Sequence, residues 1–255
     1  MHESINATLK SLEQDHGCHV RYAAESGSRA WGFASPDSDY DVRFLYAYPT
    51  GWYLDLRERP DTLEHFYPGD LDCAGWELRK ALRLFAGCNL SLCEWIASPI
   101  VYHAQGALPE ELRALAPAYF KPRKAIHHYL GTARGIRQNH LAGDAITIKR
   151  LFYVVRPLAA ATWVARSGTM PPVPLRELMG ADLLPDDVAR EVREFLAAKK
   201  SAAEGEVVRV SSGLLAWMDT AFAALQEATG DLEPEGPCDW APLNALFLRT
   251  LEELA

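Results

Sequence analysis

The spacing of hydrophobic residues divides the chain into a mixed first part and a helical second part. Ile5, Leu9 and Leu12 recur at helical spacing and predict a helix over 4–13. Alternating apolar positions, rich in β-branched and aromatic residues, predict strands over 19–24, 40–48, 63–67 and 71–74. The apolar period then returns to that of a helix, over 76–85 and 91–97.

From residue 109 onward, nearly every segment has the apolar period of a helix. The predicted helices cover 109–119, 122–141, 145–166, 186–200, 212–228 and 241–254. Prolines and glycines mark 167–175 and 230–241 as linkers. We therefore predict an α+β protein with a small mixed sheet in a first domain, residues 1–105, and an all-helical second domain, residues 106–255.

The composition is that of a globular protein, and it bears on the expected location of the protein in the cell. Of the 255 residues, 49% are hydrophobic and 24% are charged, which excludes a disordered chain. No apolar run approaches the roughly 20 residues of a membrane-spanning helix, and the N-terminus lacks the pattern of a signal peptide. We therefore expect no membrane association and a cytoplasmic location. Five irregularly spaced cysteines favour free thiols over a zinc site.

Charge is distributed unevenly along the chain. The net charge of −8 argues against a protein whose whole surface binds nucleic acid. Residues 121–166, however, hold nine Lys or Arg against one acid, a balance of +8. Residues 167–255 hold sixteen acids against seven bases, a balance of −9. This asymmetry predicts a local anion-binding surface in the middle of the chain.

Two short motifs carry the chemistry. Gly27 and Ser28 follow a predicted strand, where a glycine permits close backbone approach and a serine adds a hydrogen-bond donor, an arrangement suited to phosphate. After ten intervening residues, Asp39 and Asp41 are spaced by two on the next strand, so their carboxylates share one face. Adjacent carboxylates repel each other unless a cation lies between them, and Mg²⁺ prefers such oxygen ligands.

Together these motifs resemble the signature of the DNA-polymerase-β-like nucleotidyltransferase superfamily. The stretches 27–32 and 35–43 are more narrowly similar to its family of bacterial and phage predicted nucleotidyltransferases, which includes proteins encoded beside RNA ligases in RNA-repair cassettes. The likeness covers roughly the first two-thirds of the chain, to about Arg166. It implies that the first domain is a nucleotidyltransferase palm.

The resemblance also implies a two-metal site that binds an NTP. Two Mg²⁺ or Mn²⁺ ions would bridge the triphosphate and the carboxylates of Asp39, Asp41 and a third acid on a neighbouring strand. Asp72 is the favoured third acid, followed by Asp70 and then Glu64. An alternative interpretation of Asp72 is a helix N-cap, which would also explain its place before the helix expected at residue 76.

Further residues are candidates for binding the nucleotide. Gly27, Ser28 and Ser38 would hold phosphates, and Arg29 and Arg43 are placed to reach them. Arg43 could instead form an ion pair with Asp39 or Asp41, with which it shares a strand face. One predicted helix face presents a further set toward the triphosphate: Lys149, Tyr153 and Arg156. A weaker set for the base or the acceptor is His127, His128, Tyr129 and Arg134.

The function expected from these residues is metal-dependent transfer of a nucleoside monophosphate from an NTP to an acceptor hydroxyl. The acceptor would be an RNA end, a protein or a small molecule. An alternative is a catalytically silent nucleotide-binding or antitoxin-like module with the same fold. A metal-dependent phosphohydrolase ranks last, because His65 is the one histidine near the acids in the sequence.

Overall fold

A computed structural model describes the chain except for residues 68–70, 200–204, 233–235 and 255. Close packing of the chain divides it into two units. Unit 1 comprises residues 1–30, 39–119 and 237–255, and unit 2 comprises residues 31–38 and 120–236. The predicted boundary near residue 105 therefore differs from that in the structure. Unit 1 continues to Tyr119 and also includes the C-terminal residues 237–255.

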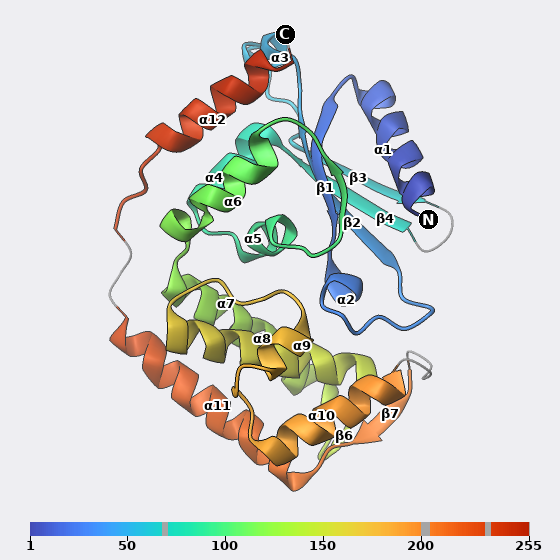
Figure 1. Cartoon of the computed structure of the whole chain (residues 1–255), viewed down its shortest axis with the longest axis vertical. Helices are drawn as coiled ribbons and strands as arrows, with labels where there is room; N and C mark the ends of the chain where they lie inside the picture. Colours follow the sequence, from blue (N-terminus) through green and yellow to red (C-terminus); the bar gives the residue numbers. More distant parts are fainter. Residues whose placement is uncertain (68–70, 200–204, 233–235, 255) are drawn as a thin grey trace. The chain divides into compact units, whose positions relative to one another are not determined.

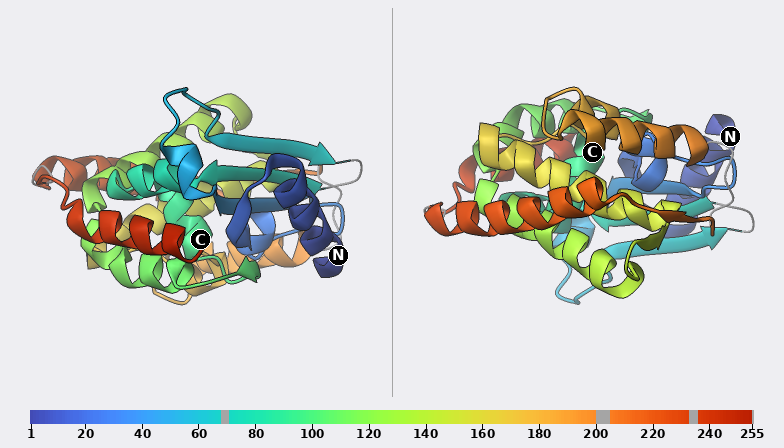
Figure 2. Two further views of the ribbon diagram at one scale, coloured as in Figure 1. Left: turned by 90° about the horizontal axis from the view of Figure 1, so that it is seen from above. Right: turned by 90° about the horizontal axis from the view of Figure 1, so that it is seen from below.

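Unit 1 is built on a five-stranded mixed sheet, as the sequence predicted (Figures 1 and 2). The spatial order is β3-β4-β2-β1-β5, and β2 and β4 are the parallel neighbours among otherwise antiparallel pairs. The strands are β1 His19–Glu25, β2 Tyr40–Ala47, β3 Thr62–Tyr67, β4 Leu71–Glu77 and β5 Val101–Ala104. The first four confirm sequence predictions, whereas β5 was not foreseen.

The helices of unit 1 cover both faces of this sheet. Helix α1, His2–His16, packs its apolar stripe against one face (Figure 1). The other face is covered by α4 Leu78–Ala86, α5 Leu90–Ile96, α6 Leu108–Tyr119 and α12 Ala241–Glu252. Alternation along β2 supplies both cores, with Phe44 on the α1 side and Leu45 on the other. Two short helices, α2 Gly27–Ala30 and α3 Thr50–Tyr53, lie in the connections.

Helix α4 begins two residues later than its hydrophobic spacing predicts. Trp76 and Glu77 continue β4 in parallel register with Leu45 and Tyr46 of β2. The Glu77 carboxylate then accepts hydrogen bonds from the backbone N–H groups of Arg79 (2.6 Å) and Lys80 (3.1 Å). Glu77 is thus the N-cap of α4, and the N-cap interpretation of Asp72 is wrong.

Unit 2 is mainly helical. Its helices are α7 Pro122–His140, α8 Ile148–Ser167, α9 Leu175–Met179, α10 Asp186–Lys199 and α11 Ser212–Asp231. The prediction of an all-helical second domain missed a two-stranded antiparallel sheet, formed by β6 Ala145–Thr147 and β7 Val207–Arg209. A strand of three residues is too short to show a period of two. The predicted helix over 145–166 therefore included the residues of β6. Within the described residues, no helix is long and apolar enough to cross a membrane.

The loop 31–38 is part of unit 2 although it connects two segments of unit 1. Phe33 stacks on Phe152 of α8, with ring centroids 5.1 Å apart. Trp31 meets Tyr153 edge to face at 5.1 Å, and its carbonyl accepts a hydrogen bond from the backbone N–H of Leu175 (2.9 Å). Aromatic packing of this kind fixes the loop on α8.

Candidate active site

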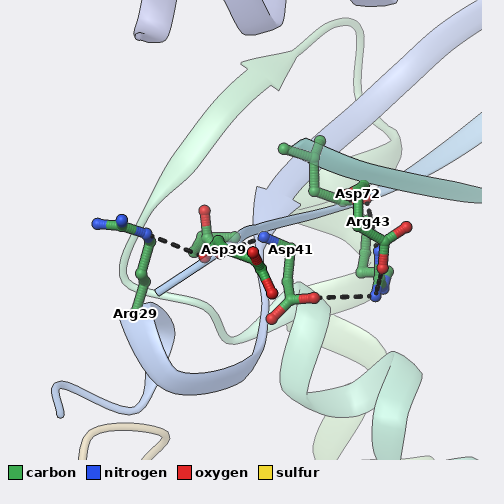
Figure 3. A network of polar contacts seen from close by, with 7 residues as sticks. Arg29, Asp39, Asp41, Arg43 and Asp72 are labelled. Carbon is green, nitrogen blue, oxygen red and sulfur yellow. Dashed lines mark hydrogen bonds and ion pairs between the residues drawn. The ribbon is translucent and has the colours of Figure 1, made fainter. Parts of the chain in front are cut away.

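Asp41 and Asp72 lie opposite each other on neighbouring parallel strands. The register of β2 and β4 pairs them directly. The Nη2 atom of Arg43 lies 3.2 Å from Oδ1 of Asp41 and 2.7 Å from Oδ2 of Asp72, so one guanidinium joins both carboxylates (Figure 3). The predicted partnership of Asp41 with Asp72 therefore has a geometric basis, because both side chains converge on one cation.

Arg43 is held in this position by the strand backbone. Its Nη1 atom donates to the carbonyls of Val42 (3.2 Å) and Asp72 (3.3 Å). The side chain retains 18% of its exposure, so the ion pairs are only partly shielded from water. Of the two roles considered for Arg43, the structure shows the ion pair with Asp41. It adds Asp72 as a second partner that sequence reasoning did not foresee.

Asp39 lies just before β2 and is exposed to solvent. Its backbone carbonyl accepts a hydrogen bond from Nε of Arg29 (3.1 Å). The Arg29 guanidinium also lies 3.7 Å from the centre of the Tyr40 ring, a cation–π contact. Arg29 therefore links α2 to the start of β2 next to Asp39 (Figure 3).

Position 27 requires a glycine because its backbone lies close to the Asp41 side chain. Its φ of +60° is in the left-handed region, which disfavours residues with a Cβ atom. A Cβ atom at this position would lie 2.2 Å from Oδ2 of Asp41, far inside contact distance. The next residue, Ser28, is buried, and its hydroxyl has no hydrogen-bond partner among the residues that the structure describes. The Gly-Ser motif thus lies directly against Asp41 of the acidic motif.

Glu25 is a site residue that sequence reasoning missed. It is fully buried, its Oε1 accepts the backbone N–H of Asp41 (2.8 Å), and its Oε2 accepts the hydroxyl of Tyr102. Burial raises the pKa of this carboxyl, although both hydrogen bonds oppose the shift. Glu25 therefore fixes the start of β2, the segment that carries Asp41. The sequence did hold a signal for Glu25, because this acidic residue follows the predicted strand and stands shortly before the Gly-Ser motif.

Other predicted phosphate contacts have local partners in the structure. The Ser38 hydroxyl accepts the backbone N–H of Ser35 (2.9 Å) and shares a hydrogen bond with the Ser35 hydroxyl (3.0 Å). These bonds close the turn at 35–38. The structure thus shows a turn-forming role for Ser38, and its predicted phosphate contact stays a prediction.

Two of the three residues predicted on one face of α8 contact the loop 31–38 within unit 2. Arg156 is only 1% exposed, its Nε donates to the Val173 carbonyl (3.0 Å), and its guanidinium lies 4.5 Å from the Trp31 ring centre. Tyr153 packs edge to face on the same Trp31 ring. Both residues therefore anchor the loop 31–38 on α8. Lys149 is half-exposed, and its triphosphate contact stays a prediction.

The other candidates for the third acid differ in what the structure shows. Asp70 lies outside the described residues. Glu64 is exposed on β3 and pairs in register with Ala74, two positions beyond Asp72 along β4. His65, the ligand that a phosphohydrolase would need, makes a ring-nitrogen contact of 3.2 Å with His16 of α1. Of the two candidates that the structure describes, the geometry favours Asp72 over Glu64, and Asp70 stays an open alternative.

The two carboxylates of the site are of the ligand type that a divalent cation prefers. Asp41 and Asp72 place hard oxygen donors around a single nitrogen of Arg43, and Mg²⁺ or Mn²⁺ prefers such donors. In the described residues, no group of three or more His, Cys, Asp or Glu side chains is close enough to hold a metal ion. A two-carboxylate arrangement is thus present, and Asp39 as an additional ligand stays a prediction.

Comparisons with known proteins agree with the motifs. Residues 1–249 match the family described as the RNA repair pathway DNA polymerase beta family. The chain is 38% identical over 254 residues to the uncharacterized protein YcgL of Bacillus subtilis (strain 168), covering 100% of this chain and 98% of that protein. A solved nucleotidyltransferase-like protein from Exiguobacterium sibiricum 255-15 is 10% identical, with coverage of 98% and 80% and a TM-score of 0.31, too low to support a structural argument.

Proposed function

The chain belongs to the RNA repair pathway DNA polymerase beta family, and from this premise we propose that it transfers a nucleoside monophosphate from an NTP to an acceptor hydroxyl. The observation that carries the proposal is the convergence of Asp41 and Asp72 from parallel strands, with the backbone of Gly27 against Asp41. Paired carboxylates beside a close-approach glycine suit phosphoryl chemistry, in which positioning and charge neutralisation dominate.

In the proposed reaction, the acceptor oxygen forms a bond to the α-phosphorus of the NTP while the bond to pyrophosphate breaks. The proton of the acceptor hydroxyl passes to a carboxylate, for which Asp72 is the favoured base. We favour an RNA end as the acceptor, because the family description names RNA repair and residues 121–166 carry a balance of +8. A protein hydroxyl and a small molecule are the alternative acceptors.

Each residue of the site has a role in this proposal. Asp39, Asp41 and Asp72 would hold two Mg²⁺ or Mn²⁺ ions, and these would supply neutralisation of the triphosphate charge. The backbone at Gly27 and the hydroxyl of Ser28 would bind phosphate oxygens. Arg43, which pairs with both carboxylates, would pair with phosphate once the carboxylates have other partners.

The phosphate-binding role of Ser28 is tested by Ser28→Ala. We expect the affinity for Mg²⁺-NTP to fall by roughly 1.5–3 kcal/mol, the contribution of a hydrogen bond to a charged group. Calorimetric titration with each NTP measures this change, and Ser167→Ala is the control, since Ser167 is exposed at the end of α8 in unit 2. If Ser28→Ala and the parent protein bound Mg²⁺-NTP with equal affinity, the Gly-Ser motif would be only a turn.

The second candidate is a nucleotide-binding module without transferase activity. The observation that favours it is the double ion pair of Arg43, which already neutralises much of the charge of Asp41 and Asp72. Incubation with each α-labelled NTP, Mg²⁺ or Mn²⁺ and a panel of RNA, protein and small-molecule acceptors separates the two. Label on an acceptor supports transfer, and NTP binding without label on any acceptor supports the silent module.

A further inference from the structure

A cavity in unit 1 is separate from the carboxylate site. It has a volume of about 390 Å³ and lies between α4 and α12. Helix α4 follows the C-terminal end of β4, whereas Asp72 is at the N-terminal end of that strand. Figure 1 shows the two helices beside each other within this unit. The cavity is therefore at the opposite end of the sheet from the acids proposed to hold metals.

The polar lining of this cavity is cationic. Arg79 and Arg83 both line it. The Nη2 atom of Arg79 donates to the Tyr53 carbonyl (3.2 Å), and its guanidinium lies over the rings of Tyr53 (4.9 Å) and Phe247 (5.8 Å). Within the described part of the chain, neither arginine pairs with a carboxylate. Two guanidinium groups without acidic partners make the cavity a binding place for an anion.

The same cavity presents an exposed aromatic surface. Trp240, the N-cap residue of α12, lines it and remains 48% exposed, and Phe247 lies two turns later on that helix. The exposed amide of Asn244 lies between them in the sequence and also lines the cavity. An exposed indole beside guanidinium groups is suited to stack with a planar ring, because such contacts need no base-specific hydrogen bond.

We propose that this cavity binds a nucleoside phosphate, with its base against Trp240 and its phosphate on Arg79 and Arg83. The Asn244 amide can both donate and accept, so it would pair with a base edge. The volume lies within the roughly 300–1,000 Å³ of small-molecule sites. The ligand is a free nucleotide or one nucleotide of a single strand. This inference does not depend on the transferase activity, because it concerns the other end of the sheet.

Calorimetric titration in EDTA tests the site without metal-dependent binding at the acids. The probes are AMP, a 5′-phosphorylated pentaribonucleotide and inorganic phosphate. We expect Trp240→Ala and Arg83→Ala to weaken AMP or pentanucleotide binding about tenfold or more. Two variants serve as controls: Leu248→Ala, an exposed apolar residue on α12, and Asp41→Asn at the other site. Neither control should change the affinity.

The outcomes separate the ligand sources and the two proposals. Equal affinity of AMP and the pentanucleotide supports a free nucleotide, and tighter binding of the pentanucleotide supports a strand. The inference is overturned if neither probe binds, if both variants bind as the parent protein does, or if inorganic phosphate binds as well as AMP. A protein that binds AMP here but transfers no nucleotide contradicts the proposed function alone, since Asp41→Asn leaves this binding unchanged.

Discussion

At the scale of residues, Arg43 is the central charge of the candidate site. One nitrogen of its guanidinium lies within 3.2 Å of carboxylate oxygens from two strands. Without a cation there, Asp41 and Asp72 would face each other across the β2–β4 pair and repel. Arg43 therefore supplies part of the neutralisation that the proposed function assigns to metal ions.

Replacing Arg43 by alanine should lower the free energy of unfolding by about 1–2 kcal/mol, between the values for exposed and buried ion pairs. Mg²⁺ should then raise the melting temperature of Arg43→Ala more than that of the parent protein, because the cation takes over the neutralisation. Thermal unfolding with and without Mg²⁺ measures both effects. Arg209→Ala, which removes an exposed ion pair with Asp144, is the control. Equal Mg²⁺ responses of Arg43→Ala and the parent protein would contradict the assignment.

The buried thiols have a different expected behaviour. Burial, followed by the charge of Glu13, raises the pKa of Cys18 to about 11. Burial, followed by the charge of Asp72, raises the pKa of Cys73 to about 12. At pH 8, roughly 10⁻³ or less of either thiol is ionised, and the thiolate is the reactive form.

Iodoacetamide at pH 8 should therefore label the half-buried Cys238 at least about 100-fold faster than Cys18 or Cys73. Raising the pH toward 11 should accelerate labelling of Cys18, because more thiolate forms. Mass spectrometry of timed samples measures the rates, and in guanidinium all five cysteines should react. Labelling of native Cys73 at the rate of Cys238 would contradict the burial that the structure gives it.

At the scale of elements, the parallel pair β2–β4 positions the site. Its register places Asp41 beside Asp72 and also places Phe44 beside Gly75. A Cβ atom on Gly75 would lie 2.2 Å from the Phe44 ring. The glycine thus lets a large aromatic residue pack across the strand pair that carries both acids.

Gly75→Ala should destabilise the protein by about 1–3 kcal/mol, the usual cost of overpacking a core. Gly51→Ala is the matched control, because Gly51 lies in α3 and a Cβ atom there meets nothing within 4 Å. Urea unfolding gives both free energies. A Gly75→Ala variant as stable as Gly51→Ala would show that Phe44 does not require the glycine.

Long periodic segments are the part of the fold that the sequence predicts well. The stripe of Ile5, Leu9 and Leu12 located α1, and repeated apolar spacing located the helices from α6 onward except the short α9. Strands of three or four residues, such as β5, β6 and β7, carry too few positions to display a period. Likewise, the Gly-Ser and Asp-x-Asp motifs and the ion pair of Arg43 with Asp41 could be read from the sequence. The role of Glu25 and the pairing of Arg43 with Asp72 depend on contacts between elements that a sequence does not display.

At the scale of the whole molecule, the chain order does not follow the units. Leu243, Leu246 and Leu251 of α12 join the core of unit 1, and Glu253 pairs with the buried Arg21 of β1. The sequence predicted α12 as a helix but assigned it to the second domain, because an apolar stripe does not say which partner it packs against. Unit 1 therefore needs both ends of the chain to complete the sheet domain that carries the candidate site.

The central claim is that this site transfers a nucleoside monophosphate, and its most direct test is Asp41→Asn. The substitution keeps the size of the side chain but removes the charge that, with Asp72, defines the site. The measurement is transfer of label from an α-labelled NTP to an RNA end with Mg²⁺, beside a thermal unfolding control. We predict transfer by the parent protein and a loss exceeding about 10²-fold in Asp41→Asn, with the fold retained. Transfer by Asp41→Asn at the parent rate would contradict the claim.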